Sequence, residues 1–500
     1  MTVFRIILLR ILALLLFAGC VAAQWPQFRG PNGSGIGKSP QLPIDFGPGK
    51  QVAWKTDLPP GHSSPILSGD RLFLTAVEGG TRAELSVGKM VDKGGKLYTI
   101  CLNRNTGVIL WKKEVPRPRL EQYQPTNSPA SPTPVTDGKS VFVFFGDFGL
   151  IAYDFAGNER WRVPLGPFNN PNGHGSSPIL VDDLLVLLCD QDTNSYLLAV
   201  DKNSGRVRWK VERPDVTRSY TTPGVVRRAS GPIELIVPGS YNLVSYNART
   251  GEKLWWINGL SWQPKSTPVI DGDVVYAHWW ENGGEAEQPT ETLTFEEILS
   301  RFDANHDKKI TREEFAAEPR LQRGFPDTDL GSDGFVDERD WNFYRARRAS
   351  RNALLAVRLG GRGDLTGSAN ILWRMQKFLP NSPSPLLYEG VLYLIKDGGI
   401  LTSLNPKTGE ILKQGRLTGA LDTYYASPIA SGGHVYLLSH QGKMTVLKAG
   451  ASWEIVGGAD FEDECFATPA IADDSIYLRT RSALFCFRKD ATVATAAEQR

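Results

Sequence analysis

The sequence is poor in the residues that mark several protein classes. Its 500 residues include only five cysteines and six histidines. Five cysteines in so long a chain cannot form the dense disulfide framework of a small secreted domain, and the histidines show no zinc-ligand spacing. A formal net charge of +2 gives no reason to expect nucleic acid as a partner. Hydrophobic residues at 41% and charged residues at 22% exclude a disordered chain.

The chain also lacks an apolar run of the ~20 residues that a membrane span needs, so we predict no transmembrane span. The apolar stretch Ile6–Phe17, interrupted only by Arg10, precedes a set of small residues. This pattern predicts a signal peptide over residues 1–23 and an exported protein, periplasmic or extracellular. Two processing routes stay open: cleavage before Gln24, or lipid attachment at Cys20, because residues 17–20 resemble a bacterial lipobox.

An internal repeat covers most of the remaining chain. A serine or threonine followed by proline recurs before a short β-rich run, with the prolines at 65, 134, 178, 223, 268, 385, 428 and 469. Most steps between these prolines are 41 to 45 residues, and the first and fifth are lengthened to 69 and 117. A period in this range predicts stacked units or propeller blades. Hairpin turns such as Asp271-Gly272-Asp273 indicate about four antiparallel strands in each unit.

A second recurring pattern ends each unit. Asp201…Gly205…Trp209 is its clearest copy, and it returns around Gly107, Gly251 and Gly409. The glycine supplies a left-handed turn position, and the tryptophan packs an outer strand against its neighbour. The last unit stops after three strands, whereas residues 51–55 form an outer strand with no blade before it. We therefore predict an all-β fold, an eight-bladed β-propeller of four-stranded antiparallel blades, closed by pairing of its two ends.

These glycine–tryptophan repeats resemble the docking motifs of the pyrroloquinoline-quinone (PQQ) repeat propellers. That family includes quinoprotein alcohol dehydrogenases and the outer-membrane barrel-assembly lipoprotein, and residues 25–35 also resemble the start of its secreted members. The resemblance implies PQQ as a candidate cofactor. Quinoprotein dehydrogenases, however, carry a vicinal cysteine pair and in some members a haem-binding Cys-x-x-Cys-His motif, and this sequence has neither. Cys101 and Cys486 occupy matching third-strand positions in adjacent blades, so either a bridge or two free thiols stays open.

The repeat is interrupted by an acidic segment, which we predict to be a helical insertion over residues 281–351. It divides the propeller into residues 24–280 and 352–490, with a disordered tail at 491–500. Residues 303–314 follow an amphipathic helix and resemble an EF-hand loop, whose oxygen ligands bind Ca²⁺. Lys308 stands where a glycine normally makes the sharp turn. The ligands expected in this loop are Asp303, Asn305, Asp307, the carbonyl of Lys309, Thr311 and Glu314.

A second loop over residues 329–340 resembles a degenerate partner. Gly334 stands at the turn position, but Gly331 offers no side-chain oxygen and Asp340 is shorter than the usual glutamate. The ligands expected here are Asp329, Asp333, the carbonyl of Phe335 and Asp340. We predict Ca²⁺ as the bound ion of the insertion, and occupancy of this second loop stays open.

The residues just before each first strand should cluster near one end of the central channel. We expect a ligand site there, polar, partly cationic and suited to a small anionic ligand. Its candidate residues are His62, His174, Arg218, Tyr220, Lys265, Asn381 and Tyr424. The function favoured by the sequence is an exported, calcium-binding, non-catalytic binding or scaffold protein, with protein partners or a small anionic ligand at the propeller face. The alternatives are a PQQ-dependent periplasmic dehydrogenase and a cell-envelope assembly factor resembling the barrel-assembly lipoprotein.

Overall fold

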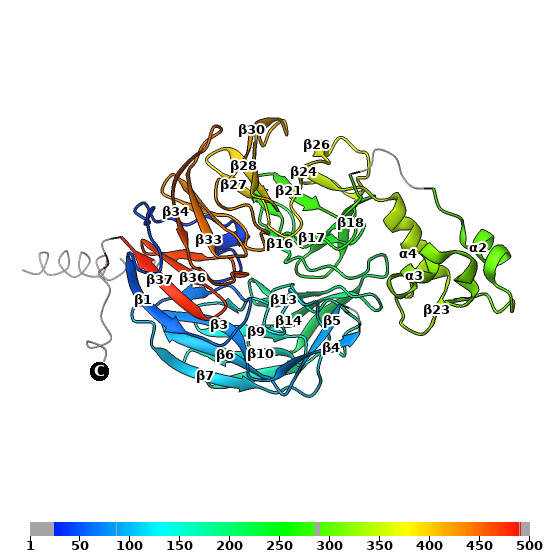
Figure 1. Ribbon diagram of the computed structural model, residues 1–500, viewed down its shortest axis with the longest axis horizontal. Coiled ribbons are helices and arrows are strands. Elements are labelled where there is room, and N and C mark those ends of the chain that lie inside the picture. Colours follow the sequence, from blue (N-terminus) through cyan, green and yellow to red (C-terminus); the bar gives the residue numbers. More distant parts are fainter. Residues whose placement is uncertain (1–24, 87, 286–290, 490, 492–500) are drawn as a thin grey trace, which may run out of the picture.

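Eight β-sheets stand in a ring, with a helical module attached to one side (Figure 1). The computed structural model describes residues 25–86, 88–285, 291–489 and 491. The predicted signal peptide with Cys20, and all but one residue of the predicted tail, lie outside the described residues. None of the described helices is long and apolar enough to cross a membrane. The predicted eight-bladed, all-β architecture is confirmed.

Each blade is a four-stranded antiparallel sheet, and blade four gains a short fifth strand. Blades one to four are β2 (Ile66–Ser68), β3 (Arg71–Glu78), β6 (Lys96–Asn103), β7 (Ile109–Val115); β8 (Val135–Thr136), β9 (Ser140–Phe145), β10 (Gly149–Asp154), β11 (Glu159–Pro164); β12 (Ile179–Val181), β13 (Leu184–Cys189), β14 (Tyr196–Asp201), β15 (Val207–Glu212); and β16 (Gly224–Val226), β17 (Glu234–Gly239), β18 (Asn242–Asn247), β19 (Lys253–Asn258) with β25 (Gly363–Asp364). Blades five to eight are β20 (Val269–Asp271), β21 (Val274–Trp279), β24 (Ala353–Arg358), β26 (Ile371–Met375); β27 (Leu386–Tyr388), β28 (Val391–Lys396), β29 (Ile400–Leu404), β30 (Ile411–Arg416); β31 (Ile429–Ser431), β32 (His434–Leu438), β33 (Lys443–Lys448), β34 (Glu454–Asp460); and β35 (Ala470–Ala472), β36 (Ser475–Arg479), β37 (Ala483–Arg488), β1 (Val52–Asp57).

The ring closes as the sequence predicts. Strand β1 pairs antiparallel with β37, so the beginning of the described chain completes the last blade. Trp54 on β1 then donates from its indole Nε1 to the carbonyl oxygen of Arg104 in blade one, at 3.0 Å. This arrangement gives blade eight its fourth strand and joins it to blade one.

The tryptophan motif links neighbouring blades around the ring. Trp111, Trp161, Trp209 and Trp373 each donate from Nε1 to a backbone carbonyl of the next blade, at 2.9 to 3.1 Å. The motif glycine of that next blade lies directly under the indole. A Cβ atom on Gly205, for example, would stand 2.9 Å from the Trp161 ring. The glycine is therefore needed for close approach as well as for its left-handed backbone.

The serine or threonine before the repeat proline links neighbouring blades by a hydrogen bond at six of the eight junctions among the described residues. The backbone N–H of Ser64 donates to Thr133 Oγ1 at 3.0 Å, and that of Thr133 donates to Ser177 Oγ at 2.9 Å. Four further links of the same kind join successive blades, up to Thr468 in blade eight. The repeated signature thus fixes the spacing of the innermost strands.

The segment before β1 contacts the inner parts of blades one, six, seven and eight. It includes the 3-10 turn η1 (Pro31–Gly33) and lies inside the ring (Figure 1). Trp25 exchanges backbone hydrogen bonds with Leu67 in blade one. Arg29 is fully buried and donates from Nη2 to the carbonyl of Pro385 in blade six at 2.7 Å. The carbonyl of Ser39 accepts a hydrogen bond from Ser431 Oγ in blade seven, and its hydroxyl accepts one from the N–H of Asp474 in blade eight. No pattern in the sequence predicted this segment, residues 25–51, which we call the plug.

Both lengthened repeats add structure between the second and third strands of a blade. In blade one the addition is a hairpin, β4 (Thr81–Ser86) with β5 (Lys89–Lys93). In blade five it is the helical module: α2 (Phe295–Phe302), β22 (Ile310–Thr311), η2 (Glu314–Ala317), α3 (Pro319–Thr328), β23 (Phe335–Val336) and α4 (Glu338–Ala349). The module has its own small core of seven buried residues, including Phe315 and Trp341.

The cysteines of the described residues are buried free thiols. Cys101 and Cys486, the pair considered for a bridge, are both unbonded. Burial raises the pKa of the Cys101 thiol to about 12 and that of Cys486 to about 11. Buried cysteines that stay protonated behave as small hydrophobic residues.

Candidate functional site: a cup at the channel mouth

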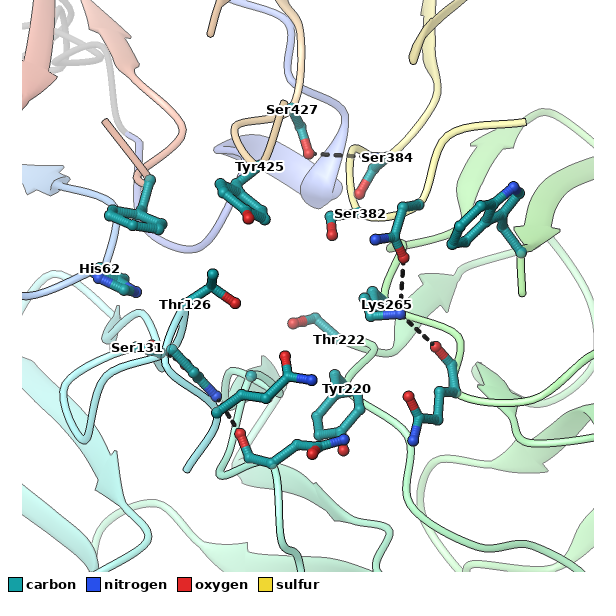
Figure 2. Close-up of a pocket in the computed structure, with 18 of the residues that line it drawn as sticks. His62, Thr126, Ser131, Tyr220, Thr222, Lys265, Ser382, Ser384, Tyr425 and Ser427 are labelled. Atoms are coloured by element: carbon teal, nitrogen blue, oxygen red, sulfur yellow. Dashed lines mark hydrogen bonds between the residues drawn. The ribbon is translucent and has the colours of Figure 1, made fainter. Parts of the chain in front are cut away.

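The mouth of the central channel is a cavity of about 700 Å³, which we call the cup. Its side chains converge from every blade on one open space (Figure 2). Phe28 of the N-terminal plug also lines it. The cup is therefore a recess whose wall comes from the ring and to which the plug contributes.

The wall follows a simple register. In all eight blades the residue three positions before the repeat proline lines the cup: His62, Ser131, Gly175, Tyr220, Lys265, Ser382, Tyr425 and Phe466. In seven of the eight blades the serine or threonine one position before the proline lines it as well, the exception being Thr267. The residue between these two is buried in every blade. The segment is extended, so alternate side chains face the cavity.

Four of the seven predicted ligand-site residues line the cup: His62, Tyr220, Lys265 and Asn381. The Lys265 ammonium donates to Asn381 Oδ1 at 2.9 Å and to the carbonyl of Gln263 at 3.3 Å. Burial lowers its pKa to about 8. The Tyr220 hydroxyl donates to Asn170 Oδ1 at 3.2 Å, and the His62 ring stacks on Phe466 with 3.8 Å between ring centres.

The other three predicted residues do not line the cup. His174 and Tyr424 stand four positions before the proline, so their side chains point into the protein. The His174 ring packs edge-on against Phe168, with 4.5 Å between ring centres, and the Tyr424 hydroxyl donates to the carbonyl of Ala420. Arg218 is buried and paired through Nε with Asp192 Oδ1 at 2.7 Å. For these three residues the expected placement was wrong. Alternation along the extended segment turns His174 and Tyr424 away from the cavity, and the pair with Asp192 holds Arg218 in the interior.

The helical insertion contributes to the wall of the cup. Arg347 on α4 lines the cavity, pairs with Glu281 and holds its guanidinium carbon 3.7 Å from the ring centre of Trp262. Nearby, Arg339 donates to the carbonyl of Asp192 at 2.6 Å, and Phe343 stacks on Tyr241 of blade four. Sequence reasoning missed this contribution, because docking of an inserted module depends on surface shape rather than on a local pattern.

The two predicted calcium loops connect helices in matching ways. Asp303 ends α2 and accepts from the N–H groups of Asp307 and Lys308, and Asp329 ends α3 and accepts from Asp333 and Gly334. Strands β22 and β23 join the loops, with Ile310 opposite Val336. Lys308 adopts the left-handed backbone that its turn position requires, with φ of 65°, and Gly334 does the same with φ of 88°.

The remaining predicted ligands lie along these loops. Glu314 accepts from the N–H groups of Ala304 and Thr311, and Asn305 Nδ2 donates to Asp307. Lys309 lies over the Phe335 ring. Asp340 is buried, and burial together with Asp337 raises its pKa to about 7. In the described residues no three His, Cys, Asp or Glu side chains converge as a ready metal cluster.

The sequence matches a known family on both sides of the insertion. The family described as outer membrane protein assembly factor BamB matches residues 98–283 and 361–492, which is more than half of the chain. The chain belongs to the BamB family. The gap in the match coincides with the helical insertion, so this module is an addition to the repeat that defines the family. No curated protein matches the chain.

Solved propellers resemble this BamB-family protein in fold. The quinohemoprotein alcohol dehydrogenase from Comamonas testosteroni aligns with a TM-score of 0.54 at 11% identity, over 93% of this chain and 80% of that one. The alcohol dehydrogenase ADHIIG from Pseudomonas putida HK5 gives 0.50 at 11%, over 94% and 81%. BamB from Moraxella catarrhalis gives 0.49 at 12%, over 83% and 100%. At such identities the likeness shows the fold alone.

Proposed function

We propose that this BamB-family propeller is an exported, non-catalytic binding protein whose cup takes a small anionic ligand. The cup itself carries the proposal, because it is a recess of about 700 Å³ in which polar groups from all eight blades converge. Lys265 and Arg347 bring two positive charges to its wall, against the single carboxylate of Glu281. Glu281 is already paired with Arg347, so Lys265 is the cation left for a ligand.

The wall also suits a ligand with hydroxyl groups. Serine and threonine side chains alternate with the amides of Gln124, Asn127 and Asn172 around the cavity. Tyr220, Tyr425 and Trp280 add aromatic surface. Amides and hydroxyls satisfy a polar ligand's hydrogen bonds, while rings pack against its apolar face. A sugar acid combines these features with a negative charge, so glucuronate is a suitable probe.

The test is titration calorimetry of the mature protein with glucuronate and with citrate. We expect binding by at least one acid, weakened about tenfold in Lys265→Gln because a charge-assisted hydrogen bond is lost. Lys210→Gln is the matched control, since Lys210 is exposed on an outer strand and paired with Glu212. If neither acid binds, or if both variants lose the same amount of affinity, there is no ligand site at Lys265.

We also propose that the insertion binds Ca²⁺. The available donors are oxygens from carboxylates, an amide, a hydroxyl and a backbone carbonyl, which is the set that Ca²⁺ prefers. In the first loop Asp303, Asn305, Asp307, Lys309, Thr311 and Glu314 would hold the ion, and in the second Asp329, Asp333, Phe335 and Asp340. The hydrogen bonds of Asp303 and Asp329 to loop N–H groups support this role, because they orient both carboxylates in the same way.

Calorimetry with Ca²⁺ tests this second part. We expect the double variant Asp303→Ala with Glu314→Ala to lose one binding event. Glu313→Ala is the control, because Glu313 is adjacent to Glu314 but is not an expected ligand. If the double variant takes up as much Ca²⁺ as the wild type, the first loop is not a calcium site.

A cell-envelope assembly role is the alternative that family membership favours, since the matched family is described as an outer membrane protein assembly factor. Its partners would be other proteins, docked on the propeller face. Affinity purification of the tagged protein from its own cells, with outer-membrane assembly components as prey, tests this alternative. Their recovery at stoichiometric amounts would favour it over small-ligand binding.

A quinone cofactor fits the cup poorly. Bound PQQ would supply redox chemistry and would need an open aromatic face. The Trp262 ring is covered by Arg347, and Tyr425 and His62 are each stacked on Phe466. These contacts cover one face of three rings of the wall, and the sequence lacks the vicinal cysteine pair of the quinoprotein dehydrogenases. We therefore derive no catalytic step through a quinone and keep the dehydrogenase function as the weaker alternative.

A further inference from the structure

A second cavity of about 320 Å³ adjoins the cup between blades eight, one and two. We call it the side pocket. The stacked rings of His62 and Phe466 line both cavities and stand between them. The hairpin β4–β5 of blade one adds Arg82 to its wall, and blades seven and eight add His440, Arg479 and Arg481. Cationic and imidazole groups from four separate segments therefore face one small space.

The arginines of the side pocket exceed its available carboxylates. Of its two acidic residues, Glu464 pairs with Arg481 at 2.7 Å, and Asp92 lies 3.9 Å from Arg117, which itself pairs with Asp147 at 2.5 Å. Arg82 and Arg479 have no carboxylate within 4.0 Å among the residues that the structure describes. Three arginines against two carboxylates leave the lining with one excess positive charge, and neither Arg82 nor Arg479 is in an ion pair within the described part of the chain.

Arg479 is the central cation of this wall. It is 1% exposed, and its Nη1 donates to Thr75 O at 2.8 Å and Ser63 Oγ at 2.9 Å. Within the described residues its Nε has no hydrogen-bond partner, and neither has Nδ1 of His440. Burial without a counter-charge lowers the pKa of Arg479 to about 9. Burial also holds the pKa of His62 well below its usual value, and the positive charges of Arg479 and Arg82 add to this effect.

A buried cation is costly unless it is paired, and a nitrogen without a partner offers a further hydrogen bond. Phosphate and sulfate groups match arginine especially well, because they accept paired N–H bonds from its planar fork. We infer that the side pocket binds the phosphate or sulfate group of an anionic ligand whose hydroxyl-bearing body lies in the cup, with Arg82, Arg479 and His440 as the contacts of that group. This inference deepens the binding function proposed above and rests on it for the ligand's body.

The experiment is titration calorimetry of the mature protein at 0.15 M ionic strength, a concentration that screens weak surface attraction. Inorganic phosphate and inorganic sulfate probe the side pocket alone, and glucose 6-phosphate probes the pocket together with the cup. We expect Arg82→Gln to weaken binding of the inorganic ions about tenfold. Arg82 is exposed, so this variant should fold. The control is Arg416→Gln, because Arg416 is an exposed arginine on β30 whose one side-chain hydrogen bond within the described residues is to Gly398 O.

The outcomes separate the side pocket from the cup. Tighter binding of glucose 6-phosphate than of inorganic phosphate, with loss in both Arg82→Gln and Lys265→Gln, supports one ligand across both cavities. Equal binding of the two phosphates, insensitive to Lys265→Gln, supports the oxyanion site while removing the proposed function of the cup. Absence of binding by all three probes, or equal weakening by Arg82→Gln and Arg416→Gln, overturns the inference.

Discussion

Arg347 of the helical insertion holds its guanidinium 3.7 Å from the ring centre of Trp262 in the wall of the cup. The two residues are 85 positions apart, and they belong to α4 and to the segment before blade five. Helix α4 begins at Glu338, inside the second predicted calcium loop, and ends beside the cup. The predicted ion site and the ligand cavity are therefore joined by one rigid element.

This contact should hold the insertion against the propeller. In Arg347→Ala the cation–π contact with Trp262 and the pair with Glu281 are both lost, at a cost of about 1–2 kcal/mol. We expect faster amide hydrogen exchange in α4 and faster proteolysis within residues 281–351. Arg348→Ala is the control, because Arg348 lies over Tyr344 inside the same helix. Equal exchange of α4 in the two variants would contradict a docking role for Arg347.

The docking glycines should be more sensitive to substitution than other left-handed glycines. Gly272 has φ of 55° with open space around it, so Gly272→Ala carries only the backbone penalty, about 1–2 kcal/mol. Gly205 has φ of 72° and lies under the Trp161 ring, so Gly205→Ala must also displace the indole, which adds about 1–3 kcal/mol. Thermal unfolding should show the larger fall in Tm for Gly205→Ala. Equal falls would mean that the indole contact is unimportant.

Much of this fold could be predicted because the propeller repeats its own local chemistry. The step between prolines gave the blade number, and the glycine–tryptophan pattern gave the docking seen at Gly205 and Trp161. The unpaired outer strand at 51–55 predicted closure onto blade eight. Each of these features depends on residues close together in the chain or on a repeated period.

The cup was predicted less well, for two physical reasons. Its wall follows a period of two, so a shift of one residue moved His174 and Tyr424 from the expected cavity into the interior, while their neighbours Gly175 and Tyr425 face it. Applying that alternation to the repeat would have found Tyr425 and Phe466. The contributions of Phe28 and Arg347 had no such signal, because a plug and a docked helix are placed by long-range packing.

Buried histidines should make the protein acid-sensitive. Burial lowers the pKa of His174 to about 3, below the unfolded value of about 6.5. The unfolded chain therefore binds the proton first, so stability is full above pH 6.5 and falls as the pH drops toward 3. In His174→Phe a phenyl ring takes the place of the imidazole against Phe144 and Phe168, and it cannot titrate. We therefore expect the free energy of unfolding to fall less steeply across this pH range in the variant.

Chemical denaturation at a series of pH values measures this dependence. His434→Phe is the control, since His434 is only half-buried at the start of β32. A pH dependence in His174→Phe as steep as that of the wild type would show that His174 does not contribute to it.

The closing contact at Trp54 should matter beyond its own blade. In Trp54→Ala the indole is lost from the space above Gly107, together with its bond to Arg104, and such truncations cost about 3–5 kcal/mol. Trp111→Ala removes the same kind of contact between blades one and two, on a strand that directly follows its sheet neighbour in the chain. Strand β1 is far from β37 in the chain and is joined to blade eight by pairing alone, so we expect only Trp54→Ala to speed hydrogen exchange along both β1 and β37. If the two variants lower Tm equally and β1 stays protected in both, closure does not depend on this tryptophan.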